Sequence, residues 1–554
     1  MTIQSFHSHS FQPTSPWLKW IVWLVFAIVW FGSLGHNVLI HPDEGRYASI
    51  SLGMLQSGDW VTPRLDGLLY FEKPALPYWM GALCFKLFGI NEFAARLWPA
   101  VCGFLSVVLV GSTARRLWGE EAGHLSALVM GSCCWVVANS HFLNLDSSLT
   151  FFLTVSLCTF LLAQRSDTGI GGRRILMWLC WAGMAGATLS KGLIGIVIPG
   201  ATLVLYSLLC REFRFWGKLH LFSGLLIFLA LAAPWFVMVS LKNHGFANFF
   251  FIHEHFQRFL TTEHKRTGPI WYFVPFLVAG FLPWTTLLPG MCLTGTEKDR
   301  RETIQSNRLL LIWSVFIFLF FSKSGSKLPS YILPMFPALA LLAGHYMARM
   351  EARRLCKHLI IPSVCWLALL VLCAFTRRFA SDDTPVEIIQ HFARFIAPAA
   401  VVFLIAAACA WRYLLLDRKR SAVLLLALAS VVSLTLVAIG YNGYAQLKST
   451  RAVVAAIQPS ADTELFSVRT YDQTFPFYLR RNVTLVDYVD EFELGENTEP
   501  SRWIPSLEGF VVRWNAAPRA MAMMQDDTYE TLQKEGVPMR VVYRDTRHLV
   551  VSKP

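Results

Sequence analysis

Charged residues are scarce in this sequence. They make up 15% of its 554 residues, whereas hydrophobic residues make up 55%. A soluble globular chain carries roughly 25% charged residues, so this composition excludes a protein that is mainly soluble. We therefore expect a polytopic α-helical membrane protein.

Cysteines away from apolar segments are also lacking. All twelve cysteines lie in or beside hydrophobic runs, and none follows Cys409. A disulfide framework or a CxxC metal site is therefore not expected.

The sequence shows no internal repeat and no low-complexity segment. No small-x-small cleavage site follows the apolar run after Lys19, which predicts an uncleaved first span.

The basic residues do not form one continuous stretch, although the net charge is +13. They occur in twos to fours between long apolar runs, a spacing that indicates membrane topology better than a nucleic-acid surface. Nucleic acid is therefore not an expected partner.

Apolar runs long enough to cross about 30 Å of hydrocarbon predict about thirteen spans. By the positive-inside rule, the side whose turns carry the basic residues is cytoplasmic. The N-terminus is then inside, and everything after about residue 441 is outside. The runs begin near positions 18, 94, 121, 145, 174, 193, 219, 271, 308, 328, 357, 394 and 420. The basic turn residues are Arg115, Arg116, Arg165, Arg173, Arg174, Arg211, Arg214, Lys218, Lys298, Arg300, Arg301, Arg349, Arg353, Arg354, Arg412, Arg418, Lys419 and Arg420.

Three outside segments are long enough to contribute to function. Residues 41–92 and 241–270 are long loops rich in aromatic and charged residues, and long loops in compact proteins are usually functional or disordered. Residues 441–554 contain segments in which apolar and polar residues alternate, such as ELFSVRTY, NVTLVDYV, FVVRW and MRVVYR. They also contain a helical pattern around 516–535. We predict a membrane domain over 1–440, with its site in the two loops, and a small α/β domain over 441–554. That domain is expected to be a scaffold or a lid for acceptor docking.

Directly after the first span comes the sequence HPDEGRY. Its Asp43, Arg46 and Tyr47 are spaced i, i+3 and i+4, so they share one face if the segment is helical. That places a carboxylate, a guanidinium and a phenol together at the membrane surface. A capped juxtamembrane helix with Asp43 at its N-terminus is an equally good interpretation of the spacing alone.

Several motifs in order resemble one enzyme family. PDEGRY is followed by Gly-Asp-Trp at 58–60, by Pro63-Arg64 and by YFEKPALPYW at 70–79. This pattern is similar to the first external loop of GT-C glycosyltransferases of the protein-mannosyltransferase superfamily. EHFQRFLTTEHKRTGPIWYF (254–273) and SKSGSKLPSYILPMFPALAL (322–341) resemble the aminoarabinose transferases of lipid A. The resemblance covers roughly residues 40–345. KPALP departs from the doubled proline of many relatives.

The resemblance implies both an architecture and an activity. The architecture is a GT-C fold with juxtamembrane helices in the first periplasmic loop. Such enzymes keep an essential acid in that loop, here Asp43. The implied reaction moves 4-amino-4-deoxy-L-arabinose from undecaprenyl phosphate to lipid A phosphates, with inversion, on the periplasmic face of a bacterial inner membrane. It confers resistance to polymyxin and other cationic peptides.

The positive-inside rule predicts few basic residues on the outer side, so the cations found there need an explanation. Lys191 stands in TLSKG, and Lys323 and Lys327 stand in SKSGSK. Anionic ligands explain such a set best, although snorkelling or contact with lipid headgroups would account for any single lysine. A transferase that joins a carrier phosphate to a lipid phosphate has anionic ligands at both ends. The same side carries Arg46, Arg64, Lys73, Arg258, Lys265 and Arg266.

A second carboxylate and a histidine-rich loop complete the candidate site. Asp146 lies in HFLNLDSS near membrane depth, where ionisable residues are costly, and is expected to position the donor sugar or its amine unless it only caps a helix. His253 of the second loop and Glu72 of the first are candidate ligands of a structural divalent metal such as zinc, and no cofactor is expected to be required. Aromatic residues either line the site or form an interfacial belt: Tyr47, Tyr70, Tyr78, Trp235, Tyr272 and Tyr331.

The expected chemistry assigns Asp43, Asp146 and Lys73 to catalysis. The carrier phosphate is held by Arg46, Lys73 and Arg258, and an acceptor phosphate attacks the anomeric carbon in line. Asp43 then orients the donor, with general-base chemistry as the alternative. The residues expected to bind substrate are Arg46, Tyr47, Tyr70, Lys191, Arg258, Lys323, Lys327 and Tyr331.

Two other functions stay open from the sequence. In a protein O-mannosyltransferase, a serine hydroxyl acceptor would need Asp43 as a true base. A flippase or transporter is expected to show charged residues at mid-bilayer and inverted repeats. Neither of those features is evident in the sequence.

Overall fold

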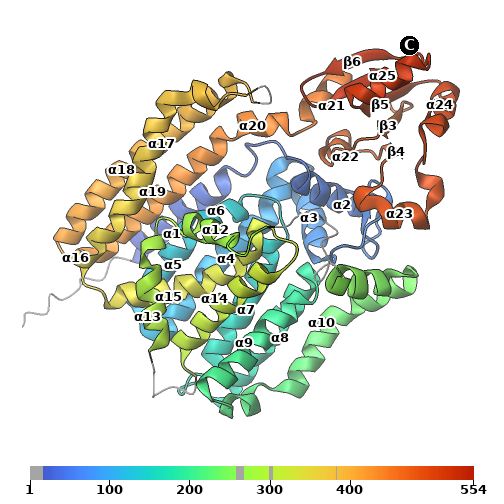
Figure 1. Ribbon diagram of the computed structural model, residues 1–554. Coiled ribbons are helices and arrows are strands. Elements are labelled where there is room, and N and C mark those ends of the chain that lie inside the picture. The colour runs from blue at the N-terminus through green and yellow to red at the C-terminus, as the bar shows by residue number, and fades with distance from the viewer. Residues whose placement is uncertain (1–15, 258–267, 298–303, 382–383) are drawn as a thin grey trace, which may run out of the picture.

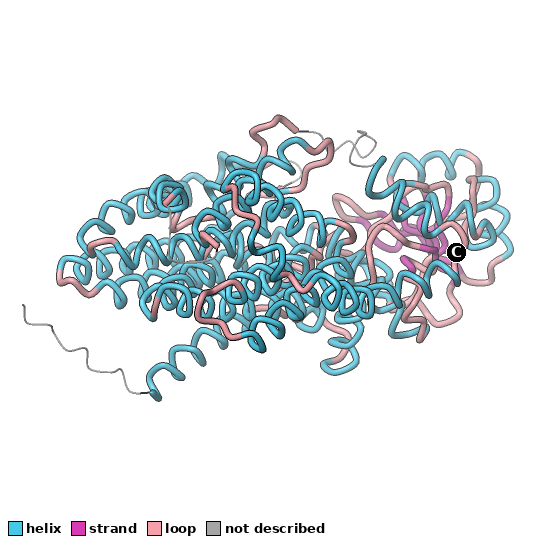
Figure 2. Tube along the Cα trace, turned by 90° about the horizontal axis from the view of Figure 1, so that it is seen from below, coloured by secondary structure: helices cyan, strands magenta, loops and turns pink. Residues whose placement is uncertain are grey.

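A helical body and a smaller α/β unit make up the chain (Figure 1). The structure is a computed structural model, and it describes residues 16–257, 268–297, 304–381 and 384–554. The α/β unit lies at one end of the elongated helical body, where Figure 2 shows the strands gathered. This arrangement agrees with the expected membrane domain followed by a small C-terminal domain.

The helical body is built from long apolar helices interrupted at glycine, proline and polar residues. Its main helices are α1 (Pro16–Gly32), α4 (Glu92–Trp118), α5 (Glu120–Ser132), α6 (Cys134–Ser140), α7 (Asp146–Ala163), α8 (Ile170–Lys191), α9 (Ile194–Cys210), α10 (Leu221–Lys242), α12 (Phe273–Gly280), α13 (Leu288–Thr296), α14 (Ser306–Lys323), α15 (Phe336–Arg349), α16 (Ala352–Leu355), α17 (Ile360–Leu372), α18 (Val386–Leu415) and α19 (Lys419–Gly440). Shorter pieces join them: η1 (Arg214–Lys218), the π-helix η2 (Asn248–Gln257), η3 (Thr285–Leu287), η4 (Pro329–Met335), η5 (Cys356–Leu359) and η6 (Cys373–Phe379).

Every apolar run expected from the sequence falls on one or more of these helices. Among the described residues, eight helices are long and apolar enough to cross a membrane, and two bent helix pairs raise the number to ten. Two shorter apolar helices span Trp20–Gly32 and Ile194–Cys210. The total of thirteen spans therefore stays a prediction.

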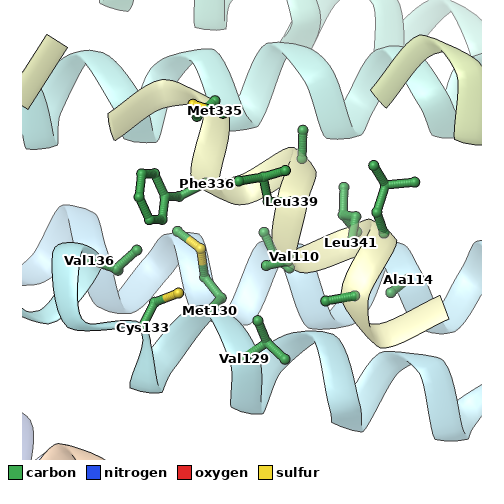
Figure 3. Packing of buried hydrophobic residues seen from close by; sticks show 14 of the residues in the cluster. Val110, Ala114, Val129, Met130, Cys133, Val136, Met335, Phe336, Leu339 and Leu341 are labelled. Atoms are coloured by element: carbon green, nitrogen blue, oxygen red, sulfur yellow. The ribbon is translucent and has the colours of Figure 1, made fainter. Parts of the chain in front are cut away.

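The core of the body lies where α4, α5 and α15 meet. Val110, Met130 and Phe336 are almost fully buried there, and Figure 3 shows their side chains between the helices. Leucines on the outward faces of α10 and α17, such as Leu229 and Leu367, are about half exposed. Helices that are apolar all round are typical of membrane spans. All twelve cysteines are free.

The loop after α1 folds into two helices and a tight hairpin. Helix α2 (Asp43–Ser57) starts at the acid of the PDEGRY motif and ends at Gly58, whose positive φ of 70° suits a helix C-terminus. Strands β1 (Arg64–Leu65) and β2 (Leu68–Leu69) pair antiparallel around Asp66 and Gly67, and α3 (Leu76–Phe88) returns to the helical body.

The C-terminal unit is the expected α/β domain. Its five-stranded sheet has the order β4-β3-β5-β7-β6; β3 is parallel to β4 and β5, and β7 is antiparallel to β5 and β6. The strands are β3 (Glu464–Val468), β4 (Thr484–Val486), β5 (Ala520–Met524), β6 (Arg540–Arg544) and β7 (Leu549–Ser552). The helices are α20 (Asn442–Leu447), α21 (Arg451–Ile457), α22 (Thr474–Leu479), η7 (Asp490–Phe492), α23 (Glu493–Thr498), η8 (Pro500–Arg502), α24 (Leu507–Ala516) and α25 (Asp526–Lys534).

Two local predictions for this unit were wrong. FVVRW, expected as a strand, lies in α24, where Phe510 and Trp514 are fully buried one turn apart while Val512 is 72% exposed. Ser506 caps this helix by accepting a hydrogen bond from the Gly509 N–H. The helical pattern around 516–535 contains strand β5 before α25, because the buried alanines and methionines of β5 complete the sheet.

The C-terminal unit packs directly on the first loop. A Cβ atom at Gly45 would lie 2.5 Å from backbone atoms of Gln473 and Thr474, so only glycine fits this contact between α2 and the start of α22. Glu499 accepts two hydrogen bonds from Arg64, at 2.8 and 3.1 Å. The C-terminal unit is thereby held against the segment that carries Asp43.

Candidate active site

A cavity of about 660 Å³ lies where α2, the segment before α3, the α6–α7 connection, η2, η4 and α23 meet. It therefore draws on the first loop, the membrane helices and the C-terminal unit. Nine of the predicted site residues line it: Asp43, Arg46, Tyr47, Glu72, Lys73, Asp146, Lys191, His253 and Tyr331.

Arg46 connects the acid of the first loop to the C-terminal unit. Its guanidinium donates to Asp43 Oδ1 at 2.8 Å and forms an ion pair through Nε with Glu491. Burial alone would lower the pKa of Arg46, but the neighbouring Tyr70 and Glu491 outweigh burial and raise that pKa well above its ordinary value. Asp43 keeps 32% of its side chain exposed to the cavity side, whereas Arg46 keeps 10%. The arginine is thus a fixed cation and Asp43 is the accessible acid.

Residue Glu44, next to Asp43, is structural. It is almost fully buried and pairs with Arg96 of α4 through two hydrogen bonds, at 2.6 and 2.7 Å. It also accepts the N–H of Leu143 at 3.0 Å, three residues before Asp146. A buried carboxylate needs such a set of partners. Glu44 therefore fixes the start of α2 relative to the segment that carries the second acid.

Asp146 stands at the first turn of α7 and is paired on both oxygens. Its Oδ1 forms an ion pair with Lys191 at the end of α8, and its Oδ2 accepts a hydrogen bond from Ser330 at 2.8 Å. The Lys191 ammonium lies 4.5 Å from the ring centroid of Tyr331, a distance suited to a cation–π contact. Residues of α7, α8 and η4 thereby form one polar cluster.

Lys73 lies between two glutamates. Its Nζ is 3.0 Å from Glu254 on η2 and 3.8 Å from Glu72, and it donates to the Glu72 carbonyl at 2.8 Å. The predicted metal ligands Glu72 and His253 line the same cavity. However, the described residues contain no group of three or more His, Cys, Asp or Glu side chains placed to hold an ion. A divalent metal stays a prediction.

Carboxylates outnumber cations in the described lining of the cavity. Three cations, Arg46, Lys73 and Lys191, face seven carboxylates. Burial raises the pKa of Glu491 even though Arg46 lies beside it. Such a cavity can hold a phosphate on its cations and a positively charged group on its acids. The carboxylates are Asp43, Glu72, Asp146, Glu254, Asp490, Glu491 and Glu493.

Four predicted site residues are not part of the described lining. Tyr70 is buried and interacts electrostatically with Arg46. Lys327 is also buried and donates to the carbonyls of Ser324 and Gly268. Lys323 is exposed at the end of α14. Arg258 lies outside the described residues, as do Lys265 and Arg266.

Sequence reasoning did not find several lining residues. Glu254 was within a quoted motif, but its pairing with Lys73 joins residues 181 positions apart and leaves no local signal. The same holds for Ser330 with Asp146. The C-terminal unit also contributes lining residues to the cavity, and the acidic run DEFELGEN around α23 was the available sequence signal for them. These residues are Asp490, Glu491, Glu493, Leu494 and Asn497.

Two family models match different parts of the chain. Residues 17–250 match the family described as dolichyl-phosphate-mannose-protein mannosyltransferase, and residues 451–553 match the aminoarabinose transferase C-terminal domain. The first match covers the helical body from α1 to α10 together with the first loop, and the second covers most of the α/β unit.

Curated relatives carry one common name. Proteins named undecaprenyl phosphate-alpha-4-amino-4-deoxy-L-arabinose arabinosyl transferase are similar over about 325 residues: 37% identical in Erwinia tasmaniensis and 34% in Pseudomonas aeruginosa. Each alignment spans 58% of this chain and 58% of the relative's own length.

Solved structures extend the similarity to nearly the whole chain. The crystal structure of ArnT from Cupriavidus metallidurans bound to undecaprenyl phosphate is 35% identical, with a TM-score of 0.92. The comparison covers 97% of this chain and 98% of that one. The archaeal oligosaccharyltransferase AglB from Archaeoglobus fulgidus shares the fold, at 12% identity and a TM-score of 0.51.

Proposed function

Because this chain belongs to the aminoarabinose transferase family within the GT-C glycosyltransferases, we propose that it transfers 4-amino-4-deoxy-L-arabinose from undecaprenyl phosphate to a phosphate of lipid A. The enzyme is a glycosyltransferase of the bacterial inner membrane, with its site facing the periplasm. The N-terminus is cytoplasmic and the C-terminal unit is periplasmic. Its action gives resistance to polymyxin and other cationic peptides.

One observation carries this proposal. A single cavity gathers the acids Asp43 and Asp146 with the cations Lys73 and Lys191, in a chain that aligns over 97% of its length with a structure bound to undecaprenyl phosphate. The cations suit a phosphate ligand, and the excess of carboxylates suits the amine of the sugar.

The carrier phosphate is held by Arg46 and Lys73, and we keep Arg258 as a predicted third contact. Each charge-assisted hydrogen bond of this kind contributes about 1.5 to 3 kcal/mol. Both described cations are paired with glutamates, Arg46 with Glu491 and Lys73 with Glu254. The incoming phosphate therefore shares or displaces these carboxylates.

The reaction forms one bond and breaks one. An oxygen of the lipid A phosphate attacks the anomeric carbon, and the bond from that carbon to the carrier phosphate oxygen breaks. Undecaprenyl phosphate leaves with the electron pair, and in-line attack inverts the anomeric configuration. Because the acceptor phosphate is already an anionic nucleophile, Asp43 is not needed as a base. Asp43 and Asp146 orient the donor and its amine.

The test is lipid A mass spectrometry with the wild type and an Asp43→Asn variant. Asp43→Asn keeps the size of the side chain and removes its charge, and we expect it to abolish the aminoarabinose adduct. Asp526→Asn, at an exposed ion pair in the C-terminal unit, is the matched control and should retain full transfer. Wild-type transfer by Asp43→Asn would refute the role of this acid. Transfer to a serine peptide instead of lipid A would refute the proposed acceptor.

A further inference from the structure

A second cavity, of about 250 Å³, lies between the first loop and the C-terminal unit. It is enclosed by the second half of α2, the β1–β2 hairpin, and the segments around Arg481 and Arg502 of the C-terminal unit. None of its lining residues belongs to the active-site cavity. The interface between the first loop and the C-terminal unit thus encloses a separate space.

Three guanidinium groups line this second cavity. Arg64 and Arg502 share a single carboxylate, that of Glu499, at 2.8 and 3.3 Å. Arg481 is held by the carbonyl oxygens of Ser460 and Thr463. The positive charge around this space therefore exceeds the negative charge that Glu499 supplies. Guanidinium groups gathered in this way are suited to phosphate.

Asp66, the fourth ionisable residue of the lining, does not cancel this charge. It is 9% exposed, and its Oδ1 accepts the Val483 N–H at 2.8 Å. Its buried Oδ2 has no hydrogen-bond partner. Burial raises the pKa of Asp66 to about 8, so the group is mainly a neutral carboxylic acid at pH 7. A neutral carboxyl is a hydrogen-bond donor, and a phosphate oxygen is a suitable acceptor.

The remaining wall is partly apolar. Leu52, Met54 and Pro476 line the cavity beside the polar groups, and such surfaces suit the carbon framework of an organic phosphate better than a bare ion. Arg46 lines the active-site cavity and Gly53 lines the second cavity, and both lie on α2. They are seven positions apart, which is about 10 Å along an α-helix.

We propose that this second cavity binds a phosphate group of the lipid A acceptor other than the one that is glycosylated. The inference rests on the proposed function and deepens it, because it makes Arg481 and Arg502 determinants of acceptor specificity. An acceptor with two phosphates would then be held at two places, one at each cavity.

The main experiment compares bisphosphorylated and monophosphorylated lipid A as acceptors for the purified full chain. We expect the wild type to have a KM roughly ten- to a hundredfold lower for the bisphosphorylated lipid, the range of one charge-assisted hydrogen bond. Arg502→Gln should reduce this preference without changing kcat or the KM of the donor. Arg502 is about half exposed, so its replacement should not unfold the chain. Arg513→Gln, at an exposed ion pair with Glu464, is the control.

A second comparison uses the titration of Asp66. As the pH rises from 7 to 9, Asp66 ionises and should repel the phosphate, so the preference of the wild type should fall. Arg64, Arg481 and Arg502 stay charged over this range, and the phenol of Tyr471, which also faces Asp66, stays neutral because burial raises its pKa. Asp66→Asn keeps a hydrogen-bond donor and an acceptor for Val483. This variant should keep the preference at pH 9.

The outcomes separate the inference from the proposed function. Equal KM values for the two lipids in the wild type, or equal effects of Arg502→Gln on both, would overturn the second phosphate site. A third outcome would also overturn it: anionic phosphatidylglycerol vesicles abolish the preference for bisphosphorylated lipid A, whereas phosphatidylcholine vesicles leave that preference unchanged. The cavity would then bind bilayer headgroups. Absence of any transfer would contradict the proposed function instead. In that case, comparing how tightly the two lipids bind to the Asp43→Asn variant would still test the second cavity, because binding does not require transfer.

Discussion

The carboxylate of Glu44 and the guanidinium of Arg96 form a buried ion pair with two hydrogen bonds, at 2.6 and 2.7 Å. Arg96 also donates to the carbonyl oxygens of Leu34, Asn37 and Val38, which lie in the segment between α1 and α2. This pair fixes the start of α2, and with it Asp43, against α4. It is the reason that the acid of the first loop has a defined place relative to the membrane helices.

Glu44→Gln should destabilise the protein by roughly 3 to 5 kcal/mol, because it leaves the buried charge of Arg96 without its partner. Transfer should fall with it, since Asp43 then loses its fixed position. Thermal unfolding and transfer rates measure the two effects. Glu351→Gln, at an exposed pair with Arg354, should change stability by less than about 0.5 kcal/mol. A fully stable and active Glu44→Gln protein would show that the pair is dispensable.

Gly45→Ala should displace the C-terminal unit from α2. The added Cβ would lie 2.5 Å from the backbone of Gln473 and Thr474, where nothing can move cheaply. Faster proteolysis of the C-terminal unit and reduced transfer are the expected results. Gly171→Ala in α8, which lines neither cavity, is the control, because no atom would lie within 4 Å of its added Cβ. It should stabilise α8 by up to about 1 kcal/mol. Identical behaviour of the two variants would contradict this account of the interface.

Lys73→Ala should lower kcat roughly ten- to a hundredfold if this lysine stabilises the departing phosphate, since each 1.36 kcal/mol corresponds to a factor of ten. Single-turnover kinetics with saturating donor isolate that step. Lys86→Ala, exposed near the end of α3, should be indistinguishable from the wild type. An unchanged rate in folded Lys73→Ala would remove this lysine from the mechanism.

His548 should make the stability of the C-terminal unit depend on pH. Burial lowers its pKa, but ion pairs with Asp472 at 3.3 Å and Asp545 at 3.1 Å outweigh burial and raise the pKa to about 9. A pKa above the usual 6.5 means that the stabilisation is complete below pH 6.5 and is lost as the pH rises through about 9. The Tm should therefore fall between pH 7 and pH 10.

His548→Gln should flatten that decline, whereas His244→Gln, on an exposed residue, should preserve it. Differential scanning calorimetry over this pH range provides the comparison. A decline that persists unchanged in His548→Gln would assign it to another group.

Much of the architecture could be predicted because its causes are local. The apolar runs placed the helices, and the PDEGRY motif placed Asp43 in the first loop. The family resemblance drawn from these motifs is confirmed, as is the C-terminal α/β domain. The failures are local as well: FVVRW has the composition of a strand, but burial of Phe510 and Trp514 on one face makes it helical. Over five residues, composition cannot distinguish the period of a strand from that of a helix.

The sequence by itself determined that this chain lies in a membrane, which family it resembles, and which acids and cations stand at helix ends. Only the tertiary structure decided that Arg46 meets Glu491, that Arg64 meets Glu499, and that Lys73 lies against Glu254. Hydropathy and charge patterns are averages over neighbours in the chain, so they report where a segment lies. Ion pairs between residues up to 445 positions apart depend on how whole elements pack, and no local pattern contains that information.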